Sequence, residues 1–312
     1  MSRSLLDLVE DTYVEAFRSV YAAVLITARD KTWLDHAVAA VTGHASSTIM
    51  CDCEAGLDRY VYEGTPDGRI GAIVQFHVPK FRKDHVRALE LTLIRRLGQD
   101  VLTCPTAAVW NVLPTQNAFP IGRKLAFFGD GYQERVRLYD RDVWQVPVMG
   151  GVFLAEELIG YADGLMGGML WLLAEDLDAG LAAAEKAVEA IRHGAPGVIM
   201  PFPGGITWSG SKAGSRYKFL FASTNHPFCP TLRDRIPDSR VPEGVRAILE
   251  IIINGESVEA VARAMRVGMQ AVRDCPGLVR ISAGNYGGRL GKTKIYLREL
   301  VQGIEGGREI GR

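Results

Sequence analysis

Hydrophobic and polar positions along the chain follow two periods, and these divide its first half into elements. The continuous apolar run at 22–28 predicts a buried strand, and apolar residues spaced three and four apart at 32–41 predict a helix. The same criteria predict strands at 47–50, 70–78 and 101–103, and a helix at about 83–97. The first half therefore has the predicted order βαββαβ.

The second half repeats this order with longer loops. The pair Ile49-Met50 recurs as Ile199-Met200, each after a helix and before a glycine-bearing loop. This weak duplication predicts an α+β fold of two ferredoxin-like, split βαβ lobes, residues 1–148 and residues 149–300. A flexible tail, 301–312, is predicted to follow them. The elements predicted in the second half are strands at 168–176, 197–200, 217–224, 246–254 and 278–282, and helices at 179–193 and 257–274.

Composition narrows the range of partners. The chain has 312 residues and is 47% hydrophobic, as expected of a protein with a substantial core, and its 36 basic residues balance 36 acidic ones. No net charge therefore attracts it to nucleic acid or to an anionic membrane. The longest apolar run, 165–174, has about half of the roughly 20 residues that a membrane helix needs. Five cysteines and an acidic N-terminus without an apolar signal core predict a cytoplasmic protein with reduced thiols.

Standard catalytic and cofactor motifs are not matched. The segment GGRLGKT (287–293) has Tyr286 where a phosphate-binding loop needs its first glycine, and no helix is predicted after it. The segment GDGYQE (129–134) lacks the third glycine of a dinucleotide fingerprint. Cys51 and Cys53 would point to opposite faces of an extended segment, and they are too few for a zinc site. We expect no metal and no nucleotide cofactor.

One carboxylate lies in an unusual place. In the predicted strand RAILEIIING, Glu250 shares a face with Ile248 and Ile252, and the opposite face is also apolar. A strand covered on both faces would remove Glu250 from water, which raises a carboxyl pKa and makes a protonated acid available near neutral pH. Two structural alternatives remain open: a buried ion pair with an arginine or lysine, and a subunit contact.

Three glycine-rich loops provide candidate binding groups. The segments 201–206, 209–215 and 283–292 offer backbone N–H groups close to Lys212, Arg289 and Lys292, an arrangement suited to an anion. Alternatively, the glycines only turn the chain. His226 lies in a polar loop and is the histidine best placed to contact a ligand, whereas its pairing with Ser223 is too loose to indicate a catalytic triad.

Longer motifs carry a family resemblance. From residue 7 to about residue 300 the chain resembles the formylmethanofuran:tetrahydromethanopterin formyltransferase family, through motifs that keep their order and occur in both predicted lobes. The motifs are DTYVEAF (11–17), TIMCDCEAG (48–56), TPDGRIG (65–71), LTCPTAA (102–108), KLAFFGDGY (124–132), PFPGGI (201–206), ASTNHPFCPT (222–231), EIIING (250–255) and GNYGGRLGK (284–292).

The resemblance implies a homo-oligomer built from dimers, usually a tetramer, with active sites at a subunit interface and no metal or prosthetic group. Methanofuran and tetrahydromethanopterin are the carrier substrates it implies. By motif, the proposed catalytic acid of the family falls on Glu250. The candidate substrate-binding residues are Gly204, Gly205, Lys212, Ser223, Thr224, Asn225, His226, Asn285, Tyr286, Arg289 and Lys292.

Three departures from the archaeal pattern indicate a bacterial, methylotroph-type member. Cys53 replaces an alanine, an acidic excess is missing, and the tail 301–312 is longer. For such a member we expect hydrolase-complex partner subunits, oxidation of formaldehyde units to formate, and flux from formyl-tetrahydromethanopterin toward formylmethanofuran. Two rival hypotheses are a non-catalytic carrier-binding or structural subunit, and a ferredoxin-like domain that senses small ligands.

Overall fold

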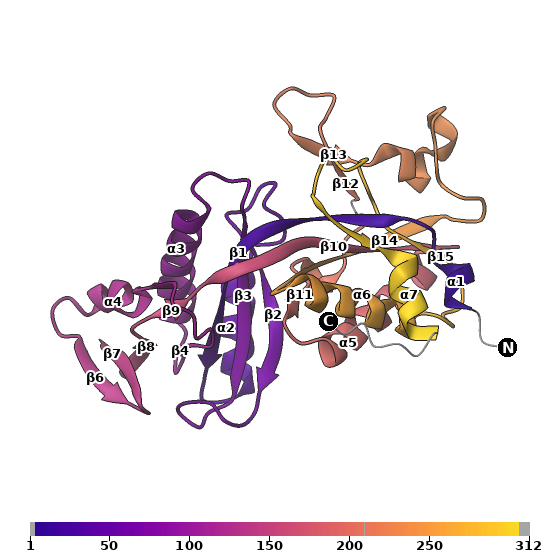
Figure 1. Ribbon diagram of the computed structural model, residues 1–312. Helices are drawn as coiled ribbons and strands as arrows, with labels where there is room; N and C mark the ends of the chain where they lie inside the picture. The colour runs from indigo at the N-terminus through magenta and orange to yellow at the C-terminus, as the bar shows by residue number, and fades with distance from the viewer. Residues whose placement is uncertain (1–3, 209, 306–312) are drawn as a thin grey trace. The chain divides into compact units, whose positions relative to one another are not determined.

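The computed structural model describes residues 4–208 and 210–305 (Figure 1). The chain forms two compact units. The C-terminal unit comprises the chain up to Arg18 together with the chain from Leu165 on, and the N-terminal unit comprises Ser19–Gly164. Helices and mixed sheet confirm the predicted α+β class, whereas the ferredoxin-like duplication and the predicted boundary at 148/149 stay predictions.

The N-terminal unit is built on antiparallel strands. From Ser19 to its end, β1 (Tyr13–Thr27) pairs with β3 (Gly71–Pro79), and its last four residues also pair with β4 (Ala108–Asn111). β2 (Glu54–Val61) pairs with β3. Alternate β1 residues, among them Val24 and Ile26, join the core formed with α2 (Lys31–Thr42) and α3 (His85–Arg96). Period-two alternation thus places one face of the strand under the helices.

The predicted order βαββαβ is confirmed here, but two predicted strands are wrong. Residues 47–50 form a turn, and the strand is β2 instead. Residues 101–103 follow α3 through a π-helical turn, Leu97–Val101, and the strand is β4. Segments of three or four residues with two apolar positions cannot distinguish a strand from a turn or a helix end. Met50 is 75% exposed, so its hydrophobicity does not indicate burial.

A second group of elements in this unit was not predicted from the sequence. It contains α4 (Ile121–Ala126), β6 (Glu134–Leu138), β7 (Arg141–Val148) and β8 (Gly151–Glu156), with the short pair β5 (Ala118–Phe119) and β9 (Ile159–Gly160). The three longer strands form a meander, and β8 also pairs in parallel with β4. β6 is largely exposed and charged, so its sequence lacks the apolar alternation that predicts a strand.

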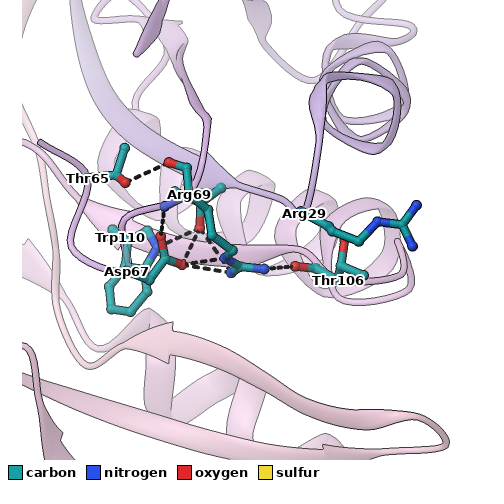
Figure 2. A network of polar contacts seen from close by, with 7 residues as sticks. Arg29, Thr65, Asp67, Arg69, Thr106 and Trp110 are labelled. Carbon is teal, nitrogen blue, oxygen red and sulfur yellow. Dashed lines mark hydrogen bonds and ion pairs between the residues drawn. The ribbon is translucent and has the colours of Figure 1, made fainter. Parts of the chain in front are cut away.

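Two of the family motifs in this unit hold each other in place (Figure 2). The Thr27 hydroxyl donates to Asp67 Oδ2 at 2.7 Å and accepts from Trp110 Nε1 at 2.9 Å. Arg69 forms an ion pair with Asp67 at 2.7 Å and donates to the Thr106 carbonyl. The TPDGRIG and LTCPTAA segments are therefore joined at the end of β1 by a polar network with a structural role.

Cys53, whose role the sequence left open, is buried in the hydrophobic core of the N-terminal unit. Burial raises the pKa of its thiol because a thiolate would lose its hydration there. The residue therefore behaves as a small apolar side chain.

The C-terminal unit places α5 (Leu177–Gly194) and α6 (Val258–Ala271) on one side of a sheet (Figure 1). β10 (Ala162–Ala174) pairs with β14 (Ala247–Gly255) and β15 (Leu278–Ser282), and β11 (Val198–Ile199) pairs with the other edge of β14. The beginning of β1 pairs with β16 (Thr293–Tyr296). These bounds confirm every element predicted after residue 160 except the strand at 217–224.

That strand is confirmed only over its last three residues, β13 (Ala222–Thr224), which pair with β12 (Ser211–Ala213). The side chains of Tyr217, Phe219 and Phe221 are 57%, 84% and 62% exposed, so their alternation does not reflect packing against a core. The unit also contains α1 (Leu5–Leu8) and α7 (Leu297–Glu305).

Residues 301–305 of the predicted tail form the end of α7, where Val301 is buried, and residues 306–312 lie outside the described residues. Within the described residues, no helix has the length and hydropathy that crossing a membrane requires.

Candidate active site

Glu250 lies in the middle of β14. Its backbone is held on both sides, by the β10 register opposite Trp171 and by a bridge to Thr207, with N–H···O distances of 2.6 and 2.8 Å. Leu249 and Ile251, on the opposite face, are buried in the core formed with α5 and α6. A register in which the core residues face the helices therefore turns the Glu250 side chain to the other face of the sheet.

The surroundings of Glu250 favour its neutral form. The residue is 4% exposed, and Trp171 Nε1 donates to Oε1 at 3.0 Å. Burial raises the pKa of Glu250 to about 7, and the Trp171 hydrogen bond lowers it by a smaller amount; among the described residues no cation contributes. Predicted burial and the raised pKa are confirmed, and the buried ion pair is not found in the described part of the chain. The catalytic role stays a prediction.

A small cavity of about 50 Å³ opens onto Glu250. Trp171 and Phe228 form one wall, with ring centroids 5.0 Å apart in an edge-on arrangement. The remaining lining comes from Trp208, Gly210, Thr224, Asn225, Cys229, Pro230 and Ile248. The space combines an aromatic wall with two small polar side chains, and it suits a small polar group at the end of a larger molecule.

The ASTNHPFCPT segment brings only some of its candidate residues to this cavity. Thr224 and Asn225 line it. The Ser223 hydroxyl donates to the Gly214 carbonyl at 3.2 Å, and His226 Nε2 lies 3.7 Å from Asp238 Oδ2. Ser223 and His226 therefore have separate partners, as expected if they do not form a catalytic pair.

The PFPGGI segment lies beside the cavity. Gly204 and Gly205 end a short 3₁₀ turn (Pro203–Gly205) with φ values of +67° and +87°, a conformation that favours glycine. Gly204 also lines a larger open depression of about 520 Å³ together with Trp208, which borders the Glu250 cavity as well. Trp208 is 75% exposed.

The backbone of the GNYGGRLGK segment is already occupied by an anion of the chain itself. The Glu15 carboxylate on β1 accepts from the backbone N–H groups of four loop residues, Tyr286, Gly288, Leu290 and Gly291, at 2.6, 2.6, 2.8 and 3.4 Å. Burial raises the pKa of Glu15, but these bonds outweigh it and the net shift is downward. These four N–H groups therefore already have an acceptor in Glu15, and binding of a substrate anion by this segment stays a prediction for its other groups.

The side chains of this segment have varied partners. Asn285 Nδ2 donates to the Thr12 hydroxyl at 2.8 Å, Arg289 Nε donates to the Tyr286 carbonyl at 2.9 Å, and Lys292 is exposed. The Tyr286 hydroxyl donates to the Ser211 carbonyl at 2.5 Å, and its pKa is raised to about 12 by burial and by the charges of Glu250 and Glu15. Lys212 is half-buried on β12.

Sequence reasoning missed three residues of this site: Glu15, Trp171 and Trp208. Glu15 carries the same signal as Glu250, an acid within an apolar strand, in YVEAF. Trp171 meets Glu250 only through the β10–β14 register, which a sequence does not specify across 79 positions. Trp208 follows the PFPGGI motif but has no motif of its own.

Comparisons with known proteins point to one family. A family model described as formylmethanofuran-tetrahydromethanopterin formyltransferase matches residues 7–148, and a second, described as the FTR proximal lobe, matches residues 151–300. The formylmethanofuran–tetrahydromethanopterin formyltransferase of Archaeoglobus fulgidus is 48% identical over 296 residues, which is 94% of this chain and 97% of the relative. That of Methanocaldococcus jannaschii is 45% identical, with coverage of 94% and 98%.

Two solved structures are also similar. The formyltransferase from Methanosarcina barkeri has a TM-score of 0.88 at 46% identity, covering 94% of this chain and 98% of its own. A chain of the formyltransferase/hydrolase complex from Methylorubrum extorquens, solved with methylofuran, has a TM-score of 0.89 at 37% identity and covers 96% and 99%. This chain belongs to the formylmethanofuran–tetrahydromethanopterin formyltransferase family.

Proposed function

We propose that this protein transfers a formyl group between N5 of tetrahydromethanopterin and the amine of methanofuran, with Glu250 as the acid. The observation that carries the role of Glu250 is its near-complete burial beside a small cavity, without a cationic partner among the described residues. Membership of the family supplies the reaction and the two carriers.

The chemistry of the transfer needs such an acid. The acceptor amine attacks the formyl carbon, a new C–N bond forms, and the carbonyl oxygen becomes an oxyanion in a tetrahedral intermediate. The C–N bond to the donor then breaks, the donor nitrogen gains a proton and the acceptor nitrogen loses one. A neutral Glu250 can donate a hydrogen bond to the oxyanion and a proton to the departing nitrogen.

Trp171 fixes the orientation of this acid. Because its indole N–H donates to Oε1, that oxygen acts as an acceptor and the proton of the neutral carboxyl belongs on Oε2. The aromatic wall also limits water, which would otherwise compete with the amine for the formyl carbon. Two of the other lining residues, Thr224 and Asn225, offer polar contacts to the reacting group.

Only the reacting ends of the carriers fit a cavity of about 50 Å³, so their tails lie outside it. The β12–β13 hairpin (residues 211–224) carries Lys212, Arg216 and Lys218 and no acidic residue. Together with Arg289 and Lys292 these side chains suit the anionic groups of the tails. Their removal should raise KM more than it lowers kcat.

The protein acts as a homo-oligomer, a dimer of dimers, with hydrolase subunits as partners. The support for the hydrolase partners is the similarity to the Methylorubrum extorquens formyltransferase/hydrolase complex, and the homo-oligomer follows from the family resemblance alone. In this setting the formyl group passes from tetrahydromethanopterin to methanofuran, toward formate. All five cysteines are free thiols, which suits a reducing compartment such as the cytoplasm.

The test is an assay of the purified chain with formyl-tetrahydromethanopterin and methanofuran. Glu250→Gln keeps the size of the side chain and removes the acid, so transfer should fall by roughly 10²- to 10⁴-fold. Glu259→Gln, an exposed carboxylate on α6, is the matched control and should transfer normally. Circular dichroism and thermal unfolding check that both variants fold.

Two outcomes would contradict the proposal. Full turnover by Glu250→Gln would exclude this residue as the acid. Binding of both carriers by the wild-type chain without transfer, even with its partner subunits present, would favour the non-catalytic carrier-binding subunit.

A further inference from the structure

Glu15 organises the loop at 284–291 through a single buried carboxylate. The residue is 3% exposed, and each of its oxygens accepts two backbone hydrogen bonds: Oε1 from Tyr286 and Gly288, and Oε2 from Leu290 and Gly291. Buried N–H groups without partners are destabilising, so this conformation of the loop depends on the carboxylate. Glu15 lies on β1, and its register opposite Lys294 of β16 fixes its position.

The glycines of the loop allow this wrapping. Gly287 and Gly288 have φ values of +67° and +81°. A Cβ at Gly291 would lie 2.2 Å from the Ala16 carbonyl oxygen, so only glycine lets the chain pass this close to β1. Gly287, Gly288 and Gly291 of GNYGGRLGK are thus explained by the need to surround an internal carboxylate.

Tyr286 connects this loop to the hairpin that contributes Thr224 to the Glu250 cavity. Its backbone N–H is bound by Glu15, and its hydroxyl donates to the Ser211 carbonyl on β12. Ser211 pairs with Thr224 on β13, and Thr224 lines the Glu250 cavity. A continuous series of contacts therefore runs from the Glu15 carboxylate to the cavity wall.

The hairpin has little packing of its own to hold it there. Its aromatic residues Tyr217, Phe219 and Phe221 are mostly exposed, so they bury little apolar surface. A segment with few buried contacts opens locally at small free energy, which gives an individual tethering hydrogen bond a large influence on its position.

We propose that Glu15 and Tyr286 are positioning residues that hold the β12–β13 hairpin over the Glu250 carboxyl and so keep water from the reacting formyl group. This inference rests on the proposed formyl transfer. Neither residue touches the formyl group; both act through the hairpin.

Loss of the tether has two chemical consequences. Water that reaches Glu250 hydrates its charged form, so its pKa falls from about 7 toward the ordinary value of 4.5. Water also attacks the formyl carbon: a C–O bond forms, the C–N bond to the carrier breaks, the nitrogen takes a proton from water and formate leaves. Hydrolysis then accompanies transfer.

The experiment compares Tyr286→Phe and Glu15→Gln with wild type. Tyr286→Phe removes only the tethering hydroxyl, and Glu15→Gln replaces an acceptor oxygen by a donor that cannot bind the loop N–H groups. Tyr296→Phe, on β16, is the control. For the two test variants we expect the midpoint of the pH–rate profile to fall by about one unit, and formate released per transfer to rise about tenfold. The control should match wild type.

A direct measurement does not depend on activity. Amide hydrogen exchange at residues 211–213, without carriers, should become roughly five- to tenfold faster in Tyr286→Phe. Unchanged exchange, or a slower transfer rate with wild-type pH midpoint and formate ratio, would overturn the tether. If Glu15→Gln does not fold, the results for Tyr286→Phe alone decide whether the tether exists.

Failure of the proposed function gives a different result. In that case the wild-type chain itself shows no transfer, while the exchange comparison still tests the tether.

Discussion

At the scale of single residues, two glutamates in apolar strands have opposite pKa shifts. Glu15 accepts four backbone hydrogen bonds, and its pKa is lowered although burial raises it. Glu250 accepts one indole N–H, and burial raises its pKa to about 7. The number of donors around a buried carboxylate therefore decides whether it is a fixed anion or an available acid. Only the second state suits proton donation near neutral pH.

The pH dependence of the reaction follows from the Glu250 pKa. Because the protonated form is the active one, the rate should be constant well below pH 7 and fall tenfold per unit well above it, with a midpoint near the Glu250 pKa of about 7. Initial rates of formyl transfer under saturating carriers, between pH 5 and 9, measure this. A rate that rises through this range would mean that the carboxylate acts as a base.

Stability should respond to the same group. Glu250 has a folded pKa of about 7 against an ordinary 4.5, so the folded chain binds the proton more tightly and gains stability as the pH falls from about 7 to 4.5. Above pH 7 the penalty of ionising it is complete, at roughly 3 kcal/mol. Glu250→Gln lacks this titration.

The free energy of unfolding of Glu250→Gln, minus that of wild type, should therefore increase as the pH rises from about 4.5 to about 7, and it should be constant below and above that range. Urea titrations at pH 4.5, 6 and 8 measure the difference. A difference that does not change with pH would show that folding does not raise the pKa of Glu250.

At the scale of elements, long periodic segments were predictable and short ones were not. Helices α2, α3, α5 and α6 repeat their apolar spacing over three or more turns, so the sequence locates them well. The four-residue strand β4 and the charged strand β6 have no such repetition. Pairing with neighbours decides these elements: β4 lies between β1 and β8.

The network of Figure 2 provides a stability prediction at this scale. The Arg69 side chain is 30% exposed and pairs with Asp67, which is 4% exposed. Arg69→Met leaves this carboxylate without its cation, so unfolding free energy should fall by roughly 2 kcal/mol, less than for a fully buried pair. Denaturant unfolding followed by circular dichroism measures the loss.

The matched control is Arg29→Met, since Arg29 is 67% exposed in its pair with Asp30. Its effect should stay under about 1 kcal/mol, as for other surface pairs. Equal losses in the two variants would show that the network adds nothing beyond a surface ion pair.

At the scale of the whole molecule, the compact units do not follow the order of the chain. β1 and β10 each contribute residues to both units, because the boundaries at Arg18/Ser19 and Gly164/Leu165 fall inside these strands. Glu15 and the loop it organises come from opposite ends of the sequence, yet both belong to the C-terminal unit. The candidate site therefore needs β1 as well as the loop at 284–291.

Two fragments test how the N-terminal unit is delimited. Residues 19–164 include β8, which pairs with β7 and β4, whereas residues 1–148 lack it. We expect cooperative thermal unfolding for 19–164 and a lower Tm or no transition for 1–148. The reverse order would support the boundary at 148/149 that the sequence predicts.

The sequence by itself determined the elements with sustained periodicity, the α+β class, the family and the presence of an acid in an apolar strand. These follow from local spacing and from motifs, which are properties of neighbouring residues. Only the tertiary structure decided that Trp171 binds Glu250 and that Glu15 fills the loop expected to hold a substrate anion. Such partners are set by strand register and by residues up to 276 positions apart, which local patterns do not encode.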